Sequence, residues 1–494
     1  MTEGFGIDFG TTNSVAARSD AATGRTLPFT DRETNLPHPS VVWYRGNQVV
    51  VGKEAKHQLK GFADEAGNAF VRSIKRKLGR DSGVTVFGER KEAYEIAAEI
   101  FRFLRQQAKD NYDYDLENVV LTVPVRFEGT AREDLRKAAN AAGIEIKTFI
   151  HEPFAAVIGY CYSSARDIES LNGLNILVFD WGGGTLDITV ARIKDGQIFE
   201  LATAGLEDIA GDHFDSRLES YARGCFLNRH GLREDILSLR PGTRAKLSTE
   251  CERAKISLSS RTAERLQLRL FFHRESLDYD LDAEITRPRF EGLIATDVDA
   301  ALRQVDQVIG DAALTPEEID AALLIGGSSR IPMLRSEMNV RFGARAIDVR
   351  NADTIIAEGA AIIAQNDWLP YLARPIQVRL SDGALYTIFE RGQILKPEVC
   401  RKEVSFYCTD NRDGEAHMVI VESLRPGDTT AVRTVQILNV PVSAALPRPY
   451  NHERVSAVFE IDENLVFWSS AWSATQQSVV HTPVHDICFG LRVR

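Results

Sequence analysis

Two short stretches of the sequence combine an aspartate, glycines and a threonine directly after an apolar, strand-like run. The first spans residues 6–13 (GIDFGTTN) and the second spans residues 179–187 (FDWGGGTLD). A glycine turn between two strands lets backbone N–H groups approach a polyphosphate, threonine hydroxyls add donors, and an aspartate can hold a hydrated divalent cation. Because Asp8 and Asp180 lie far apart in the chain, the pattern indicates two related halves that each contribute one phosphate hairpin.

A third glycine pair lies in residues 325–330 (IGGSSR), after the apolar run 322–324. One such turn alone is more often an ordinary hairpin than a nucleotide site, but three in one chain favour the nucleotide site. The other common nucleotide motifs are missing from the sequence. Gly52 and Lys53 are followed by Glu54 rather than Ser or Thr, and no G-x-G-x-x-G follows a predicted strand. This excludes a P-loop or Rossmann protein.

The elements that position these turns follow an α/β pattern as far as about residue 366. Apolar residues at three- and four-residue spacing predict a long helix over 89–109. A strand at 119–123 is followed by a helix over 135–142, for which residues 130–133 (TARE) have capping-box spacing. After residue 370 the sequence changes to short β-like runs separated by turn residues, which is typical of an antiparallel sandwich.

Composition limits the class of protein and its partners. The 494 residues are 44% hydrophobic and 26% charged with a net charge of −11, which fits a globular chain of about two to four domains. No stretch gathers enough Lys and Arg for a nucleic-acid footprint. The six cysteines form no C-x-x-C pair, and no apolar run approaches the ~18 residues of a membrane span. We therefore expect a cytoplasmic protein with neither nucleic acid nor membrane as a partner.

The ordered motifs resemble the Hsp70 (DnaK-like) chaperone family, part of the actin and sugar-kinase superfamily. The resemblance covers residues 4 to about 366 densely. Besides the two hairpins it rests on residues 73–80 (SIKRKLGR), 121–124 (LTVP), 151–156 (HEPFAA), 251–259 (CERAKISLS), 326–332 (GGSSRIP), 351–353 (NAD) and 359–361 (GAA). Across 370–494 the resemblance is confined to short patches.

The resemblance implies an α/β fold, in which a two-lobed actin-like (ribonuclease-H-like) ATPase domain is followed by an all-β sandwich. We expect the ATPase domain at 1–366, an interdomain linker at 367–373 and a sandwich that binds substrate or partner at 374–494. In the family a helical lid follows the sandwich. Because the strand-like run 487–491 is followed by the end of the sequence at Arg494, we expect a variant without the lid.

The resemblance also implies the catalytic and cation-binding residues. Asp8 and Asp180 would hold Mg²⁺, largely through water, and Thr185 would contact the phosphates of ATP. Lys75 would position the attacking water. The implied cofactors are ATP or ADP and Mg²⁺, with K⁺ as a further candidate cation.

Further residues would surround the nucleotide by the same resemblance. Glu252, Lys255 and Ser259 are spaced to share one helix face and would meet the adenosine, and Arg330 would stack near the adenine. The complete implied set is Gly10, Thr11, Thr12, Asn13, Gly182, Gly183, Gly184, Gly211, Glu252, Lys255, Ser259, Gly326, Gly327, Ser328, Arg330 and Asp353.

In the family a proline and a charged pair relay the nucleotide state to the substrate domain, and the matching positions are Pro124, Arg132 and Glu152. The implied partners are unfolded or extended polypeptides, a J-domain cochaperone and a nucleotide-exchange factor. Two departures from the family stand out. Ala210 replaces a glycine before Gly211, and its methyl is expected to restrict the backbone near the γ-phosphate. The linker reads DWLPYLA, so its proline is expected to hinder docking as an added edge strand.

Three hypotheses follow. The first is an ATP-dependent chaperone that couples hydrolysis to the binding of unfolded polypeptides. The second is an ATP-switched regulatory or assembly protein whose β domain binds one dedicated partner. The third, a small-molecule kinase of the same superfamily, is disfavoured because the strings around Lys75 and Glu152 are chaperone-like and the C-terminal third is β-rich.

Overall fold

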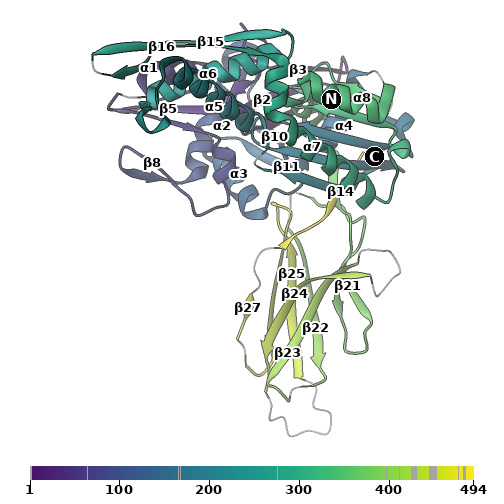
Figure 1. Ribbon diagram of the computed structural model, residues 1–494. Helices are drawn as coiled ribbons and strands as arrows, with labels where there is room; N and C mark the ends of the chain where they lie inside the picture. Colours follow the sequence, from purple (N-terminus) through teal and green to yellow (C-terminus); the bar gives the residue numbers. More distant parts are fainter. Residues whose placement is uncertain are drawn as a thin grey trace.

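The computed structural model consists of an α/β domain from which an elongated β domain projects (Figure 1). The α/β domain has two lobes, each built on one mixed sheet. The structure describes residues 3–63, 65–164, 166, 168–207, 209–274, 276–396, 399–410, 412–423, 431–443, 453–476, 478–481 and 485–493.

The first lobe contains a sheet with the strand order β11-β10-β1-β2-β3. The bounds are β1 Gly4–Phe9, β2 Asn13–Asp20, β3 Arg25–Phe29, β10 Asn118–Val123 and β11 Glu145–His151. Strands β1, β10 and β11 run parallel, whereas β1, β2 and β3 are antiparallel neighbours. Helices α2 (Ala93–Tyr112) and α3 (Gly129–Ala141) contribute apolar side chains to the core on this sheet.

The second lobe repeats this arrangement. Its sheet has the order β18-β17-β12-β13-β14-β29-β19. The bounds are β12 Asn175–Trp181, β13 Leu186–Lys194, β14 Gln197–Leu206, β17 Ala321–Ile325, β18 Ala346–Asp348, β19 Leu369–Leu372 and β29 Phe489–Arg492. Here too an antiparallel trio, β12 to β14, lies beside two parallel strands, β17 and β18. The equivalent order agrees with the two related halves predicted from the duplicated hairpin.

Helices α4 (Glu152–Ser163) and α9 (Ile355–Gln365) pack against each other between the two sheets. Gly359 permits this close approach, because a Cβ at this position would lie 1.8 Å from the carbonyl oxygen of Ala155. Both helices are almost entirely apolar and buried. They therefore join the two lobes, because α9 contacts β1 and β2 of the first sheet and α4 contacts β12 of the second.

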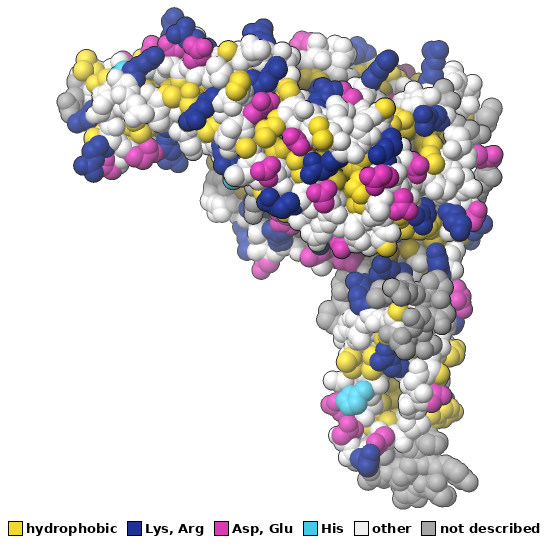
Figure 2. All heavy atoms as spheres, turned by 45° about the vertical axis from the view of Figure 1, so that its right-hand side comes forward, with side chains coloured by type: hydrophobic (Ala, Val, Ile, Leu, Met, Phe, Trp, Pro, Cys, Tyr) yellow, Lys and Arg dark blue, Asp and Glu magenta, His cyan; other side chains and the backbone are white. Residues whose placement is uncertain are grey.

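Smaller elements complete the outer part of each lobe. The first lobe adds a three-stranded sheet and helix α1; their bounds are β5 Val41–Arg45, β6 Gln48–Val51, β7 Asn68–Arg72 and α1 Lys53–Phe62. The second lobe adds helices and a hairpin, with bounds α5 Gly211–His230, α6 Pro241–Leu258, α7 Arg287–Asp311, α8 Pro332–Phe342, β15 Ala263–Arg274 and β16 Leu277–Thr286. Figure 2 shows that basic and acidic side chains are interspersed over the visible face of this domain.

The β domain is an antiparallel sandwich, as the sequence predicts. One sheet has the order β21-β20-β23-β24 and the other β22-β25-β26-β27, with β28 also paired to β26. The bounds are β20 Ile376–Arg379, β21 Leu385–Phe389, β22 Cys400–Cys408, β23 Glu415–Ser423, β24 Val432–Pro441, β25 Glu453–Ile461, β26 Val466–Ser473, β27 Val480–His481 and β28 His485–Asp486. Alternate side chains of both sheets fill one apolar core.

The chain does not end in the sandwich. Residues 486–493, which we call the return segment, run back to the α/β domain (Figure 1). Strand β29 within this segment pairs with β14 on one side and with the linker strand β19 on the other. The range 374–494 expected for the sandwich therefore includes four residues, 489–492, that lie in the sheet of the second lobe.

Two helix boundaries differ from the sequence-based expectation. The helix expected at 89–109 begins only at Ala93, because residues 89–91 pair as strand β9 (Glu89–Lys91) with β8 (Val84–Val86). The helix expected at 135–142 begins at Gly129, and its N-cap is Glu128 rather than a capping box at 130–133. The earlier start places Arg132 inside α3, on the same face as Arg136 one turn later.

Candidate functional site

A cavity of about 1190 Å³ separates the two lobes above helices α4 and α9. Most of the residues implied by the sequence line it: Asp8, Gly10, Thr11, Thr12, Asn13, Lys75, Pro124, Glu152, Asp180, Gly182, Gly183, Gly184, Thr185, Glu252, Ser259, Gly326, Gly327, Arg330 and Asp353. Residues from eight separate stretches of the chain therefore converge on one space, whose volume is ample for a nucleotide.

The two glycine hairpins face each other across this cavity. A Cβ on Gly183 would lie 2.2 Å from Oγ1 of Thr12, and one on Gly184 would lie 2.8 Å from Cγ2 of Thr11. Glycine is therefore needed at both positions for the hairpins to come this close. Oγ1 of Thr12 is buried and has no hydrogen-bond partner among the residues that the structure describes. A buried hydroxyl without a partner, beside backbone amides at two glycine turns, fits an anion such as a polyphosphate.

Lys75 lies at the floor of the cavity. Its Nζ donates to Oε1 of Glu152, at 2.8 Å, and both side chains are buried. Burial favours the neutral amine, but the carboxylates of Glu152 and Asp8 keep the pKa of Lys75 above its usual value. The pair joins the short helical turn Ile74–Lys77 to the first residue of α4. It thus holds one fixed positive charge where the two hairpins meet.

Three aspartates stand close to this lysine. Burial, followed by the charge of Glu152, raises the pKa of Asp8 to about 7 and that of Asp187 to about 6. The same causes raise the pKa of Asp180 well above its usual range. Carboxylates that burial makes reluctant to ionise gain most from a nearby cation. The donor set therefore fits Mg²⁺, which prefers carboxylate oxygen and water ligands.

The sequence analysis quoted Asp187 within the second motif but gave it no role. It pairs directly with Asp180 across the β12–β13 hairpin and lines the cavity. Its position two residues after Thr185 on an alternating strand was the available signal, since residues i and i+2 share a face. Lys56 was also missed: its Nζ lies 2.7 Å from Oε1 of Glu252.

This contact between Lys56 and Glu252 connects α1 of the first lobe with α6 of the second lobe. It therefore spans the cavity between the outer parts of the lobes. Nothing in the sequence marked Lys56, because it lies in an ordinary surface helix. The attraction of Lys56 opposes the effect of burial on Glu252, and the pKa of Glu252 falls below its usual value.

Three implied residues, Gly211, Lys255 and Ser328, are not among those that line the cavity. Nζ of Lys255 donates to the carbonyl oxygen of Gly211 at 2.9 Å and pairs with Asp215 at 2.8 Å. Oγ of Ser328 donates to the carbonyl of Gly182 at 2.9 Å. Gly211 and Ser328 thus contact the backbone of the second hairpin without lining the cavity, and Lys255 contacts Gly211 in turn.

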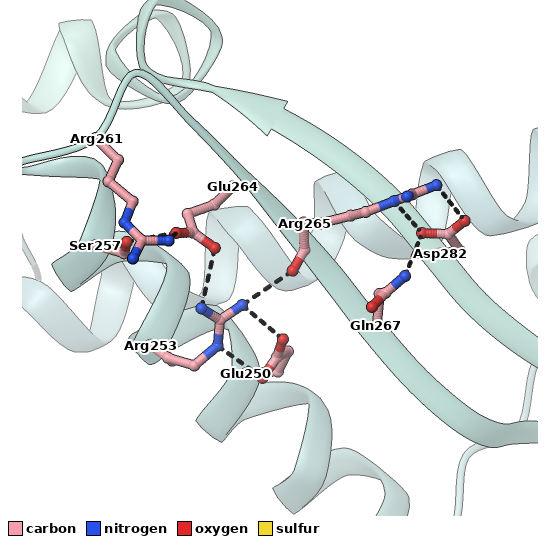
Figure 3. A network of polar contacts seen from close by, with 8 residues as sticks. All are labelled: Glu250, Arg253, Ser257, Arg261, Glu264, Arg265, Gln267 and Asp282. Atoms are coloured by element: carbon pink, nitrogen blue, oxygen red, sulfur yellow. Dashed lines mark hydrogen bonds and ion pairs between the residues drawn. The ribbon is translucent and has the colours of Figure 1, made fainter.

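The outer face of α6 is tied to the β15–β16 hairpin by a network of charged groups (Figure 3). Nη2 of Arg253 donates to Glu250 at 2.8 Å and to the carbonyl of Arg265 at 2.9 Å, while Nη1 donates to Glu264 at 3.0 Å. Hydrogen bonds from Ser257 and Arg253 hold the pKa of Glu264 at about 2. This network fixes α6, so that its inner face presents Glu252 to the cavity.

The third glycine pair lies at the far wall. Gly326 has φ +77°, and a Cβ there would lie 2.5 Å from the carbonyl oxygen of Trp181, so only glycine fits. Gly327 has no atom within 4 Å of such a Cβ and opens to the cavity. Nη2 of Arg330 donates to Asp353 at 2.6 Å. Arg330 and Asp353 thus form a paired polar surface at this wall of the cavity.

Ala210 does not strain the loop after the second hairpin. Its φ of −154° and ψ of −173° are extended values open to any residue, and its side chain joins the core of the second lobe. The amides of Gly211 and Asp212 donate to the carbonyls of Gly182 and Gly183 at 3.2 and 2.8 Å. A Cβ on Gly211 would lie 3.1 Å from Cα of Gly183. The close approach therefore belongs to Gly211, and the methyl of Ala210 points away.

Two of the three implied relay residues, Pro124 and Glu152, line the cavity, but Arg132 does not. Its guanidinium contacts the β domain instead. Nε donates to the carbonyl of Asn464 at 2.6 Å, and Nη2 donates to the carbonyl of Leu465 at 3.2 Å and to Asp486 at 2.6 Å. Arg132 therefore binds the turn between β25 and β26 and the start of the return segment.

The linker does form an edge strand, and the expectation that its proline would hinder this was wrong. Pro370 lies in β19, opposite Leu491 of β29. Its carbonyl oxygen accepts a hydrogen bond from the amide of Leu395 at 2.8 Å. Proline is tolerated here because β19 is the last strand of the sheet. The unexpected feature is the partner, since β29 lies between the linker and β14.

Comparisons with known proteins agree with this geometry. The family model described as Hsp70 protein matches residues 4–92 and 81–369. The chaperone protein DnaK of Thermotoga neapolitana is 30% identical over 501 residues, which cover 98% of this chain and 80% of that protein. The chaperone protein DnaK of Thermosipho melanesiensis is 29% identical over 482 residues, which cover 94% of this chain and 77% of that protein. Among the described helices, none is long and apolar enough to cross a membrane.

Proposed function

The chain belongs to the Hsp70 family, and from this premise we propose how its residues carry out the family's work. The protein is an ATPase and an Hsp70-type chaperone, which couples ATP hydrolysis to the binding of unfolded polypeptides. We propose that ATP binds in the cavity between the lobes. The observation that carries this proposal is the opposed pair of glycine hairpins, with the buried hydroxyl of Thr12 between them.

In this proposal each hairpin holds one side of the triphosphate. Backbone amides of residues 10–13 and 182–185 and the hydroxyls of Thr11, Thr12 and Thr185 donate to phosphate oxygens. Asp8 and Asp180 hold Mg²⁺, with Asp187 close by, and the bound cation offsets the phosphate charge. Glu252 and Ser259 face the adenosine from α6, while Arg330 and Asp353 form its far wall.

Lys75 carries the chemical step. Glu152 fixes its ammonium group, so that this group orients the attacking water and stabilises the charge that develops during phosphoryl transfer. The buried ion pair prevents Lys75 from reaching into solvent. Since Glu152 also begins α4, a shift of this helix changes where the ammonium stands. A movement of helices α4 and α9, which join the two lobes, would therefore change the position of Lys75 in the cavity.

We further propose that the sandwich of residues 376–486 binds extended polypeptide segments. A J-domain cochaperone and a nucleotide-exchange factor are proposed as partners by analogy with the family, as is a cytoplasmic site of action. Arg132, Pro124 and Glu152 are proposed to relay the nucleotide state. Support for the relay is the position of Arg132, whose guanidinium binds the sandwich directly.

The decisive experiment measures ATP turnover of the intact chain with and without a panel of unfolded apolar peptides. Peptides should stimulate turnover, and Lys75→Ala should abolish most of it in both conditions. Lys77→Ala, which removes a neighbouring cation, is the matched control and should behave as the wild type. Turnover that responds only to one folded protein would instead favour a dedicated interaction module.

A further inference from the structure

The return segment lies at the centre of the contact between the two domains. Strand β29 pairs with β14 through Gln197 opposite Arg492 and Ile198 opposite Leu491. On its other side it pairs with all four residues of the linker strand β19. Two further backbone hydrogen bonds extend the ladders: Ala373 donates to Cys488, and Val493 donates to Gly196, both at 2.9 Å. In the sheet of the second lobe, the return segment therefore lies between the linker strand and β14.

The side chains of the segment are buried on both domains. Phe489 is 1% exposed and belongs to an apolar cluster that runs continuously from the first lobe through Leu372 into the sandwich. Leu491 and Val493 are 0% and 2% exposed and join the cluster between α4, α9 and the second sheet. Burying an aromatic and two aliphatic side chains removes enough apolar surface to hold a short strand in place.

Gly490 makes the close packing of three strands possible. A Cβ at this position would lie 2.6 Å from the buried ring of Tyr371 in β19 and 2.7 Å from the carbonyl oxygen of Ile198 in β14. These two contacts lie in the strands on either side of β29. A single methyl group would therefore push against both neighbours, which makes Gly490 the most direct point at which to disturb the segment.

A short chain of contacts leads from this segment to the cavity. The rings of Phe489 and His151 are in contact, with centroids 4.0 Å apart and planes tilted by 34°. His151 is the N-cap of α4, and Glu152, which follows it, accepts the hydrogen bond from Lys75. Burial lowers the pKa of His151 to about 3, with the charge of Arg132 as a lesser cause. The contact is thus one between two neutral rings throughout the physiological pH range.

We propose that Phe489 is a positioning residue for ATP hydrolysis: the return segment docks between β14 and the linker, and the contact of Phe489 with His151 sets the placement of Glu152 and Lys75. The segment then has two roles. It holds the linker and the sandwich against the α/β domain. Through His151, its docking also affects the positions of Glu152 and Lys75 in the active site. This inference rests on the proposed roles of Lys75 and Glu152 in the cavity.

The mechanism predicts a change in rate rather than in nucleotide affinity. Phe489 is separated from the hairpins that would bind the phosphates, so its loss should leave the KM for ATP within about two-fold. A shift in the Lys75 ammonium of a fraction of an ångström should lower kcat by about ten-fold, since small misplacements from remote changes cost up to about 10²-fold. A residue that merely stabilised the fold would alter neither quantity in the folded fraction.

The test uses the intact chain with two variants, Phe489→Ala and Gly490→Ala. Val479→Ala, an exposed side chain outside the segment, and Gly224→Ala, where a Cβ has open space, are the matched controls. Amide hydrogen exchange of residues 369–373 reports linker docking, and steady-state kinetics reports kcat and KM. We expect faster exchange together with a kcat about ten-fold lower in both variants, and wild-type behaviour in both controls.

Each other result contradicts the inference. If linker exchange became faster while kcat stayed unchanged, the segment would have no role in catalysis. If exchange stayed unchanged in both variants, β29 would not hold the linker in place. A large rise in the KM for ATP would place the effect on binding instead. If the wild type itself hydrolysed no ATP, the proposed function would fail first, because the hydrogen-exchange comparison can still be made without turnover.

Discussion

The cavity and the interdomain joint are built from different kinds of sequence information. The two opposed hairpins of the cavity are local motifs: each has a strand, a glycine turn, and a threonine and an aspartate within a few residues. The joint combines Arg132 from α3, the turn at 462–465 and the return segment, which are distant in sequence. A local motif can be recognised from the sequence because its residues are close together in the chain. A joint formed by pairing of distant strands leaves no such pattern. The residues of the proposed active site could therefore be predicted from the sequence, whereas the docking of the return segment could not.

The largest expected effect concerns Lys75 in the cavity. Lys75→Ala should lower ATP turnover by about 10²-fold or more, because it removes the group that orients water and stabilises charge. Nucleotide binding should be largely retained, since the hairpins are unchanged. Single-turnover hydrolysis and equilibrium binding of a labelled nucleotide separate the two quantities. Equal single-turnover rates in Lys75→Ala and Lys77→Ala would remove Lys75 from the mechanism.

The next effect concerns the joint. Arg132→Ala removes buried hydrogen bonds from a charged donor to the sandwich, each worth about 1.5–3 kcal/mol. The sandwich should then separate from the α/β domain far more often, and proteases should cut near residues 462–465 at least ten-fold faster. Arg102→Ala, an exposed arginine on α2, is the control. Identical digestion patterns for Arg132→Ala and wild type would show that the joint does not depend on this residue.

Much of the cavity was predictable for a physical reason. Glycines at 182–184 and a threonine after a strand have few uses other than a tight turn near an anion, and the repeat at 10–13 strengthened that reading. The two halves were likewise predicted from the repeated hairpin, and the alternating helices and strands and the sandwich from periodicity and turn residues. Asp187 was missed because an aspartate on a strand usually faces solvent, and only its partner Asp180 shows that it points into the cavity.

The joint could not be predicted to the same depth. The run 487–491 was recognised as strand-like, and β29 spans Phe489–Arg492. Its pairing partners are β14 and β19, and neither choice is encoded by local pattern because every exposed strand edge offers the same hydrogen-bonding groups. Pro370 was misleading for the same reason: whether a proline disrupts a sheet depends on which strand is at the edge.

A smaller effect tests the contact between the outer parts of the two lobes. Lys56→Ala removes the contact with Glu252 that spans the cavity. Both side chains are partly exposed, so the loss is at most about 1 kcal/mol, and ADP should leave up to about five-fold faster. Stopped-flow release of a fluorescent ADP measures this. Lys109→Ala, whose partner Asp113 lies in its own lobe and which does not line the cavity, should release ADP at the wild-type rate.

The smallest effect concerns pH at the joint. Glu200 on β14 is half-buried near Arg374 and Cys488, and its partial removal from water raises its pKa to about 7. The stability that neutral Glu200 contributes is present at low pH and is lost as pH rises from its unfolded value to about 7. Glu200→Gln should therefore match the wild type in Tm near pH 5 and exceed it by a few degrees at pH 8. A difference in Tm that stays constant between these pH values would contradict the assignment.

In this structure the return segment and the linker dock as one unit on the second lobe. Hydrogen exchange of the wild-type chain, followed at each amide of residues 369, 371–373 and 489–493, measures this docking. If β29 lies between β14 and β19, both strands should be strongly protected and should open together, with equal exchange rates under conditions where opening limits exchange. Rapid exchange of residues 489–493 beside a protected linker would contradict the claim, because the linker would then pair with the lobe without the return segment.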